Sequence, residues 1–311
     1  MPKGAGWAIA AALALAEPLV APHLPGMATH SDYLLSVLFL VFLYGAMATG
    51  WNILGGFAGQ VSFGHAAFFG IGAYATAILA LAGWPLLLTL PVGGLVAGVY
   101  SILIGPPAFR LRGPYFAIAT IGIGEATRLI ALNWNSLTGG ASGLTLGTPL
   151  PALAQYYIAL GICVGAVGIA AWIKSSRFGY ALAAIRSDPD AAETLGVDTT
   201  LVKTQALFVS AFILGVAGCA FAMHNLYVSP GSVFDFKTAI SLVIMPLIGG
   251  IGTLAGPLLG AAIFTGLREQ LEASFPNLDL LVFGALLCVI ILFEPRGLLG
   301  AFGRFRRRRA G

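Results

Sequence analysis

The sequence predicts an all-α polytopic membrane protein with about ten transmembrane segments, within a range of about eight to ten. Of its 311 residues, 58% are hydrophobic and 9% are charged, whereas charged residues make up about a quarter of a soluble domain. The mean hydropathy is correspondingly high, at +0.92. Apolar runs of bilayer-crossing length follow one another along the chain. This composition excludes a water-soluble enzyme, a disordered chain and a nucleic-acid-binding protein.

Each predicted segment corresponds to an apolar run. The clear runs are residues 7–20, 33–54, 61–82, 86–104, 114–132, 155–173, 204–227 and 280–293. A further stretch, 238–271, is too long for one straight helix. It is interrupted by Gly249, Gly250, Gly252, Gly256 and Pro257. Because glycine and proline break helices, this stretch predicts two spans with a break between them.

The basic residues agree with this topology. With a cytoplasmic N-terminus, alternating spans place four basic segments on the cytoplasmic side: Lys3, 110–112, 174–203 and 296–311. Few of the 16 Lys and Arg residues lie elsewhere, namely Arg128, Lys237 and Arg268. Cytoplasmic segments of membrane proteins carry an excess of Lys and Arg, so the pattern follows the positive-inside rule.

The predicted domain organisation is a single transmembrane domain over 1–311. Residues 174–203 form a cytoplasmic loop within it, and 296–311 form a basic cytoplasmic tail that also meets anionic membrane lipid. The segment 133–154 is rich in Gly, Thr, Ser and Pro, and predicts an outer loop without a further crossing. Residues 1–16 allow a second interpretation, since Lys3, a short apolar core and small residues before Glu17 resemble a cleaved signal peptide.

The sequence shows no pattern for a metal, a cofactor or a nucleotide. The three cysteines lie inside apolar runs, at Cys163, Cys219 and Cys288, and are interpreted as small buried hydrophobes. His65 has no second ligand at metal-binding spacing nearby. The Lys-Ser and Lys-Thr pairs at 174–175 and 237–238 lack the glycines of a phosphate-binding loop. We therefore expect no catalytic residue, no cofactor and no metal site.

The loop at 174–203 predicts a short capped helix. Its signals are an N-cap, a proline at the first helical position, acidic residues near the N-terminus and a closing glycine: Asp188, Pro189, Asp190, Glu193 and Gly196. Its apolar residues are few: Ala191, Ala192 and Leu195. So short a helix has no core of its own, so it either docks against a partner or connects two spans at the membrane surface.

Polar residues cluster with glycines at the start of the predicted span 61–82. Gln60, Ser62 and His65 would line a translocation pathway or gate, because polar groups at membrane depth face a bundle interior or a water-filled cavity. The alternative is that they hydrogen-bond neighbouring helices together. Ser62 and His65 lie within helical reach of each other, but no third residue orients the histidine, which disfavours a membrane-embedded enzyme.

Glu125 and Arg128 lie at i and i+3 in the middle of an apolar run, where they can form an ion pair. They either belong to the pathway, together with Asn133 near the outer end, or form a structural bolt between helices. The glycines of the broken stretch also allow two interpretations. Gly249, Gly250 and Gly252 either line a cavity with irregular backbone or form a tight turn between spans.

Five segments together resemble one family of transport proteins. They are AIRSDPDAAETLGVD at 184–198, GQVSFGHAAFFGIGAY at 59–74, GPYFAIATIGIGEATRLIALNWNSLTGGASG at 113–143, GGIGTLAGPLLG at 249–260 and FEPRGLLG at 293–300. The first looks like the ATPase-docking loop of bacterial ABC importer permeases. Its form is that of the branched-chain amino acid permeases, the LivM family, and the similarity runs over about 43–300.

The resemblance implies a multi-pass permease subunit of the bacterial inner membrane that translocates leucine, isoleucine and valine. The implied partners are a second, LivH-like permease subunit, two cytoplasmic ATPase subunits and an extracytoplasmic substrate-binding protein. ATP hydrolysis would then take place on the partner subunits, and this chain would not be an enzyme.

The resemblance also implies that the helix at 188–196 is a coupling helix in a groove of the ATPase. Ala191 and Ala192 would allow close approach, while Glu193 and Arg186 would hydrogen-bond at the groove rim. Two alternatives stay open: a urea or short-amide importer permease, and an ion-coupled secondary transporter or channel. In the second alternative Glu125 and His65 would be the candidates for the coupling-ion site.

Overall fold

The computed structural model describes residues 31–147, 149–274, 284–285 and 297–299. In these ranges the chain is almost entirely helical, apart from one pair of two-residue strands. The elements are α2 Ser31–Asn52, the π-helix η2 Ile53–Phe57, α3 His65–Leu81, α4 Leu86–Ala108, α5 Pro114–Asn133, α6 Asn135–Thr138, the 3-10 helix η3 Gly140–Ser142, β1 Leu144–Thr145, α7 Ala152–Ser175, α8 Arg177–Ser187, α9 Pro189–Thr194, α10 Thr199–Asn225, β2 Tyr227–Val228, α11 Pro230–Val233, α12 Phe236–Gly249 and α13 Gly256–Ser274.

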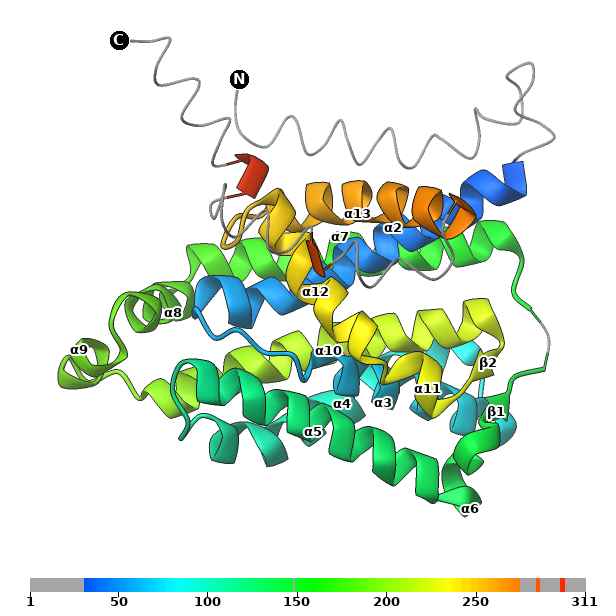
Figure 1. The fold of residues 1–311 in the computed structure, drawn as a ribbon, viewed down its shortest axis with the longest axis horizontal. Helices are drawn as coiled ribbons and strands as arrows, with labels where there is room; N and C mark the ends of the chain where they lie inside the picture. The colour runs from blue at the N-terminus through cyan, green and yellow to red at the C-terminus, as the bar shows by residue number, and fades with distance from the viewer. Residues whose placement is uncertain (1–30, 148, 275–283, 286–296, 300–311) are drawn as a thin grey trace, which may run out of the picture.

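The long helices form a bundle around α10 (Figure 1). α10 packs against α2, α3, α4 and α7, and its apolar window is 72% buried, more than that of any other candidate span among the described residues. Glycines allow these helices to approach closely. A Cβ atom on Gly72 of α3 would lie 2.0 Å from the carbonyl oxygen of Gly215 in α10, so these two backbones pack directly against each other.

The structure confirms a polytopic helical membrane protein, but it does not confirm the count of about ten spans. Among the described residues, 6 helices are long and apolar enough to cross a bilayer, and α3 is a shorter apolar helix. α13 is not among them, because Arg268, Glu269 and Glu272 place charge in its second half. The predicted runs 7–20 and 280–293, and the possible signal peptide, lie outside the described residues, apart from 284–285.

The prediction for 61–82 is wrong over its first residues. α3 begins only at His65, and residues 58–64 are not helical. Figure 1 shows this segment running back from the end of α2 toward the middle of the bundle. Ser62 and Gly64 are buried. Non-helical backbone is tolerated at membrane depth only where protein or a cavity surrounds it, and apolar composition alone does not distinguish such a segment from a helix.

The predicted break in 238–271 is confirmed. α12 ends at Gly249 and α13 begins at Gly256, with a non-helical turn between them. A Cβ atom on Gly249 would lie 1.8 Å from the carbonyl oxygen of Gly256, and one on Gly260 would lie 1.8 Å from that of Met245. These glycines therefore let the two broken helices pack closely side by side.

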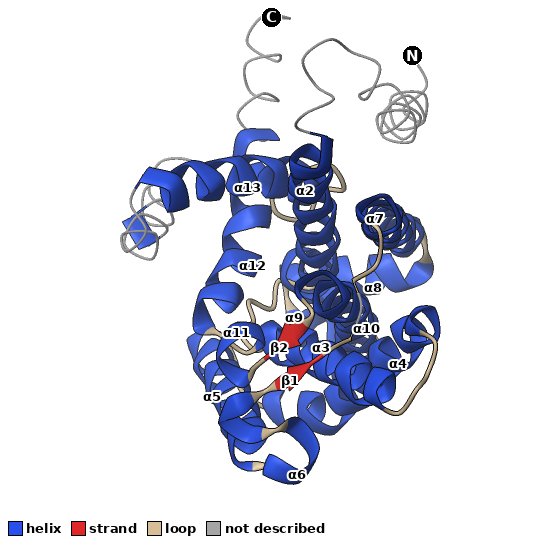
Figure 2. Cartoon of the chain, turned by 90° about the vertical axis from the view of Figure 1, so that its right-hand side faces the viewer, coloured by secondary structure: helices blue, strands red, loops and turns tan. Residues whose placement is uncertain are grey.

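The connecting segments gather at two opposite ends of the bundle (Figures 1 and 2). α8 and α9 lie at one end, which we call the α9 end. α6, β1 and β2 lie at the other, which we call the α6 end. The segment 133–154 makes no further crossing within its described residues, as predicted. Instead β1 pairs antiparallel with β2, with Leu144 opposite Val228 and Thr145 opposite Tyr227.

Candidate functional site

The short helix α9 has the predicted caps. The Asp188 carboxylate accepts hydrogen bonds from the backbone N–H groups of Asp190 (2.9 Å) and Ala191 (3.1 Å). Pro189 occupies the first helical position, and Gly196 ends the turn with a φ of 85°. These local signals fix a helix of only 6 residues without a core of its own.

A second helix, which the sequence analysis missed, connects α9 to the membrane. α8 covers Arg177–Ser187. Its N-cap is Ser176, whose hydroxyl accepts a hydrogen bond from the N–H of Gly179. The flanking spans reach further than the loop 174–203 suggests, because α7 ends at Ser175 and α10 begins at Thr199. The serine N-cap and Arg186 in the last turn are the signals that could have predicted α8.

α9 is fastened to two other parts of the chain. Arg112, in the loop between α4 and α5, forms an ion pair with Asp190 at 2.9 Å, and this hydrogen-bonded partner raises the pKa of Arg112. The hydroxyl of Thr199, at the start of α10, donates to the Glu193 carboxylate. α9 is therefore connected both to α5 and to the central helix α10.

The exposed residues of α9 and its C-cap are of mixed character: Asp190, Glu193 and Thr194 are polar, whereas Ala191 and the C-cap Leu195 are apolar. Leu195 exposes 82% of its surface, and Ala191 is exposed as well. Ala192, in contrast, is 2% exposed and faces the chain itself. Of the residues that the resemblance assigns to a partner groove, Leu195 and Ala191 are therefore available, whereas Ala192 packs internally.

Arg186 is directed into the permease bundle. Its guanidinium Nη1 donates a 2.6 Å hydrogen bond to the carbonyl oxygen of Gly56, in the π-helix that follows α2. Lys174, at the end of α7, donates from Nζ to the carbonyl oxygen of Gly252 at 3.0 Å. Both basic side chains thus satisfy carbonyl groups that a regular helix would have paired internally.

Asn52 joins the two irregular segments that receive these hydrogen bonds. Its Oδ1 accepts from the N–H of Gly252 at 2.8 Å, and its Nδ2 donates to the carbonyl oxygen of Thr253 at 2.9 Å. We call Asn52, Lys174 and Arg186 the backbone clamp. The clamp ties the end of α2, the break between α12 and α13, and the last turns of α7 and α8 together. Gly252 is at its centre, and Gly249 and Gly250 lie nearby in the sequence.

Ser62 and His65 connect helices inside the bundle. His65 is fully buried, and its Nε2 lies 2.9 Å from the hydroxyl of Ser210 in α10. Since that hydroxyl donates to the carbonyl oxygen of Gly50, His65 Nε2 is the donor toward Ser210. The backbone oxygen of Ser62 accepts from Trp51 Nε1 at 2.7 Å. The side chain of His65 therefore joins α3 to α10, in keeping with the alternative interpretation, whereas the Ser62 hydroxyl accepts a local hydrogen bond from the N–H of Gly64.

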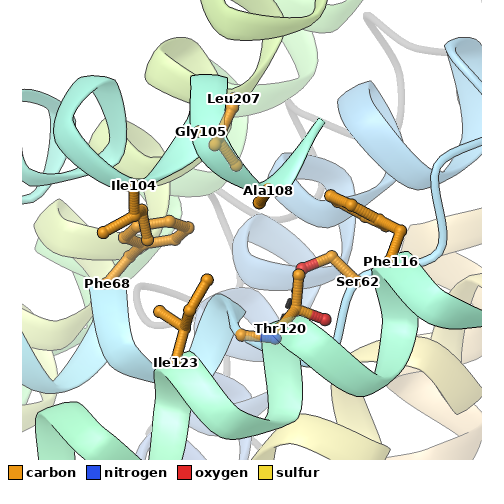
Figure 3. A pocket seen from close by; sticks show the side chains of 10 residues that line it. Ser62, Phe68, Ile104, Gly105, Ala108, Phe116, Thr120, Ile123 and Leu207 are labelled. Atoms are coloured by element: carbon orange, nitrogen blue, oxygen red, sulfur yellow. Dashed lines mark hydrogen bonds between the residues drawn. The ribbon is translucent and has the colours of Figure 1, made fainter. Parts of the chain in front are cut away.

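The space beside Ser62 is closed. Figure 3 shows Phe68, Ile104, Phe116 and Ile123 converging on it from three helices. The free volume among them is about 10 Å³, which is at the limit for a single water molecule. Gln60 lies earlier in the same non-helical segment and is half-buried. A space of this size does not accommodate an amino acid.

Glu125 and Arg128 form the predicted ion pair on α5, and Glu125 borders an open cavity between α5 and α12. Arg128 donates from Nε and Nη2 to the two carboxylate oxygens of Glu125, at 2.9 and 2.6 Å. Their side chains are 50% and 29% exposed. Both residues lie on α5 and their ion pair is within that helix, so it is not a bolt between two helices. Because charged groups at membrane depth avoid lipid, this face of α5 borders a partner or a water-filled space.

The remaining predicted positions are peripheral. Asn133, at the end of α5, donates to the carbonyl oxygen of Leu129 on its own helix. Cys163 and Cys219 are buried thiols, as expected, while Cys288 lies outside the described residues. Within the described part of the chain, no three His, Cys, Asp or Glu residues are grouped closely enough to hold a metal ion.

Comparisons with known proteins agree with this arrangement. A family described as branched-chain amino acid transport system / permease component matches residues 33–291. The high-affinity branched-chain amino acid transport system permease protein LivM of Escherichia coli (strain K12) is 30% identical over 296 residues, which covers 84% of this chain and 68% of the relative. LivM of Salmonella typhimurium is 29% identical over 296 residues, which again covers 84% of this chain and 68% of the relative.

A more distant relative carries a different name. The probable branched-chain amino acid transport permease protein LivH of Methanocaldococcus jannaschii is 28% identical over 144 residues, which covers 43% of this chain and 44% of that protein. No solved structure matches the chain.

Proposed function

Because the chain belongs to the branched-chain amino acid transport system / permease component family, we propose that leucine, isoleucine and valine are its substrates. The chain is a permease subunit of an ABC importer and a multi-pass protein of the inner membrane. It is a membrane transport component, and it works with a second permease subunit. Two cytoplasmic ATPases and an extracytoplasmic binding protein complete the proposed importer.

The exposed Leu195 at the C-terminal end of α9, together with the exposed Ala191, is the observation that carries the coupling part of this proposal. A helix of 6 residues is not stable by itself, yet α9 is capped and fastened at both Asp190 and Glu193. Its exposed Leu195 and Ala191 suit a groove on a partner surface. We propose that this groove lies on the ATPase and that α9 is the coupling helix that binds in it.

The fastenings of α9 support a rigid transmission of movement. In this proposal a displacement of α9 passes to α10 through the hydrogen bond between Thr199 and Glu193, while the exposed Arg112–Asp190 pair adds a weaker contact with the loop before α5. Arg186, next to α9, pulls on the π-helix after α2 through Gly56. Nucleotide-driven movement of the ATPases would therefore change the packing of the membrane helices, and so switch access from outside to inside.

The test is a replacement at the tip of α9. In the assembled importer, Leu195→Asp should abolish recovery of the ATPase with the affinity-purified permease, because it places a charge in an apolar groove. Leu137→Asp is the matched control, since Leu137 is an exposed leucine of α6 at the opposite end. Retention of the ATPase on Leu195→Asp would contradict the coupling assignment. ATP-dependent uptake of leucine, compared with urea, tests the substrate class separately.

A further inference from the structure

A cavity of about 180 Å³ lies next to Glu125, between α5, α12 and the segment before α3. Its walls are mostly apolar, with Phe63, Ile121, Phe234 and Phe236 among them, and Glu125 is its charged member. The cavity is open on one side. It is distinct from the closed space of Figure 3, which lies among α3, α4, α5 and α10.

The cavity forms where two helices are interrupted. Phe63 lies in the non-helical segment before α3, Phe234 lies in the break between α11 and α12, and Phe236 is the first residue of α12. Glu125 lies near the middle of the 20-residue helix α5, about 16 Å along the axis from Pro114 at a rise of about 1.5 Å per residue. Irregular backbone at that depth is tolerated where it borders a cavity. The non-helical segments therefore lie where the structure can accommodate them, beside this cavity.

We propose that this cavity is a substrate subsite that takes the aliphatic side chain of the transported amino acid, while Glu125 and Arg128 bind its ammonium and carboxylate groups. The inference rests on the proposed function, which it deepens by placing a contact for the substrate. An apolar cavity of about 150 Å³ accommodates a molecule of benzene, so about 180 Å³ is sufficient for a side chain of three or four carbons.

The ion pair has unused hydrogen-bonding capacity for a zwitterion. A carboxylate offers about four lone-pair sites and a guanidinium five N–H donors, and the internal pairing uses two of each. The side chains are also accessible, because Glu125 is 50% exposed and Arg128 29%. An ammonium group can therefore donate to Glu125 while a carboxylate accepts from Arg128.

Charge balance favours the same ligand. The pair of Glu125 and Arg128 is neutral overall, and so is an amino acid zwitterion. Binding the two together adds no net charge at membrane depth, whereas a cation or an anion would leave one member of the pair without its counter-charge. Apolar walls beside a neutral ion pair thus match an amino acid with an aliphatic side chain.

Gly124 gives a direct test, because a side chain placed there fills the cavity. A Cβ atom at Gly124 would meet the Cα of Gly64 at 3.9 Å, an ordinary van der Waals contact, so a side chain can begin there without a backbone clash. Leucine and valine differ by one methylene, and one methylene in an apolar pocket changes selectivity by about tenfold or more. In the complete importer in proteoliposomes, Gly124→Val should lower the ratio of leucine to valine uptake by about tenfold.

Two further variants keep the test informative. Gly168→Val on α7 is the matched control, because a Cβ atom there has nothing within 4 Å, and the ratio should stay at its wild-type value. Phe236→Leu enlarges the cavity from an exposed position, and should shift the ratio in favour of leucine. It serves as the main test if Gly124→Val does not assemble.

The outcomes separate this inference from the proposed function. If the wild-type importer takes up neither leucine nor valine with ATP, the proposed function is wrong and the subsite with it. If the wild type transports both, but Gly124→Val and Phe236→Leu leave the ratio unchanged, only the subsite is wrong. A shift in opposite directions in the two variants is the result that supports it.

Discussion

The α9 end and the face of α5 that carries Glu125 and Arg128 use their charged side chains in different ways. At the α9 end, Arg186 and Lys174 donate to backbone carbonyls of two separate irregular segments, so each side chain connects elements distant in the sequence. On α5, Arg128 bonds to Glu125 one helical turn away. The first arrangement holds parts of the chain together, whereas the second lies beside an open cavity and leaves hydrogen-bonding groups of Glu125 and Arg128 available to a ligand.

This difference shows how to distinguish a region that transmits movement between helices from a region that binds a ligand. Removing a connecting side chain should change how movement passes between helices, while the partner still docks. Removing one member of an exposed ion pair should change what is bound, because the other charge loses its counterpart. The predictions below test each side of this comparison, from the largest expected effect to the smallest.

The largest effect is expected for Arg186→Met. Methionine keeps an unbranched apolar chain but cannot donate to Gly56, and a hydrogen bond from a charged group contributes about 1.5–3 kcal/mol. ATP-dependent leucine uptake should fall by about tenfold or more, while the ATPase subunits are still recovered with the permease. The measurement is uptake in proteoliposomes together with ATPase recovery after affinity purification.

Arg177→Met is the control for this change, since Arg177 is an exposed arginine at the other end of α8. Its uptake should match that of the wild type. Loss of the ATPase from the Arg186→Met complex would show instead that Arg186 contacts the ATPase groove, as the family resemblance implies. Unchanged uptake in Arg186→Met would show that the hydrogen bond from Arg186 in the backbone clamp is not needed to transmit movement from the ATPase.

An intermediate effect is expected at the ion pair. Arg128→Leu and Glu125→Leu should each lower leucine uptake by about tenfold, because each removes one binding group and leaves an unpaired charge on a membrane helix. In the double variant no unpaired charge remains, but both groups that bind the substrate are absent. Its uptake should therefore stay low. Uptake assays on the two single variants and the double variant measure this coupling.

Recovery of uptake in the double variant would contradict a binding role. It would show that the pair only neutralises two charges, either within α5 or against the second permease. The recovered amount of the permease complex controls for assembly in each variant. Since Asp235 also acts electrostatically on Arg128, Asp235→Asn in the Arg128→Leu background tests whether that residue contributes an unpaired charge as well.

The sequence predicted the parts of this fold that depend on local signals. The long apolar runs located α2, α4, α5, α7 and α10, and the caps located α9, because an N-cap or a closing glycine acts within a few residues. The Glu125–Arg128 pair followed from its spacing on one helix. Glycines and a proline in a long apolar stretch were sufficient to predict the break between α12 and α13.

The parts that were missed depend on contacts between distant residues. Nothing local distinguishes Asn52 from an ordinary polar residue at the end of a span, and its partners are Gly252 and Thr253. The inward direction of Arg186 depends on the π-helix at Gly56, which has no sequence signature. In the non-helical segment 58–64, Ala58, Ser62 and Gly64 are buried among other helices, and composition does not record that burial.

The smallest effect is expected at the cap of α9, and Asp198 provides the comparison. Asp188 caps a helix of 6 residues with two hydrogen bonds, whereas Asp198 caps the 27-residue, largely buried α10 with one to Leu201. Loss of an N-cap costs about 0.5–2 kcal/mol. Asp188→Ala should therefore increase hydrogen exchange of the α9 amides several-fold and lower uptake about twofold.

Asp198→Ala should leave exchange along most of α10 unchanged, because packing in the bundle, and not the cap, holds that helix. Hydrogen exchange followed by mass spectrometry on the intact importer measures both helices in one sample. Equal protection of α9 in Asp188→Ala and in the wild type would show that the contacts of Asp190 and Glu193 are sufficient to order it. In that case the connections to α5 and α10, and not the cap, determine the position of the coupling helix.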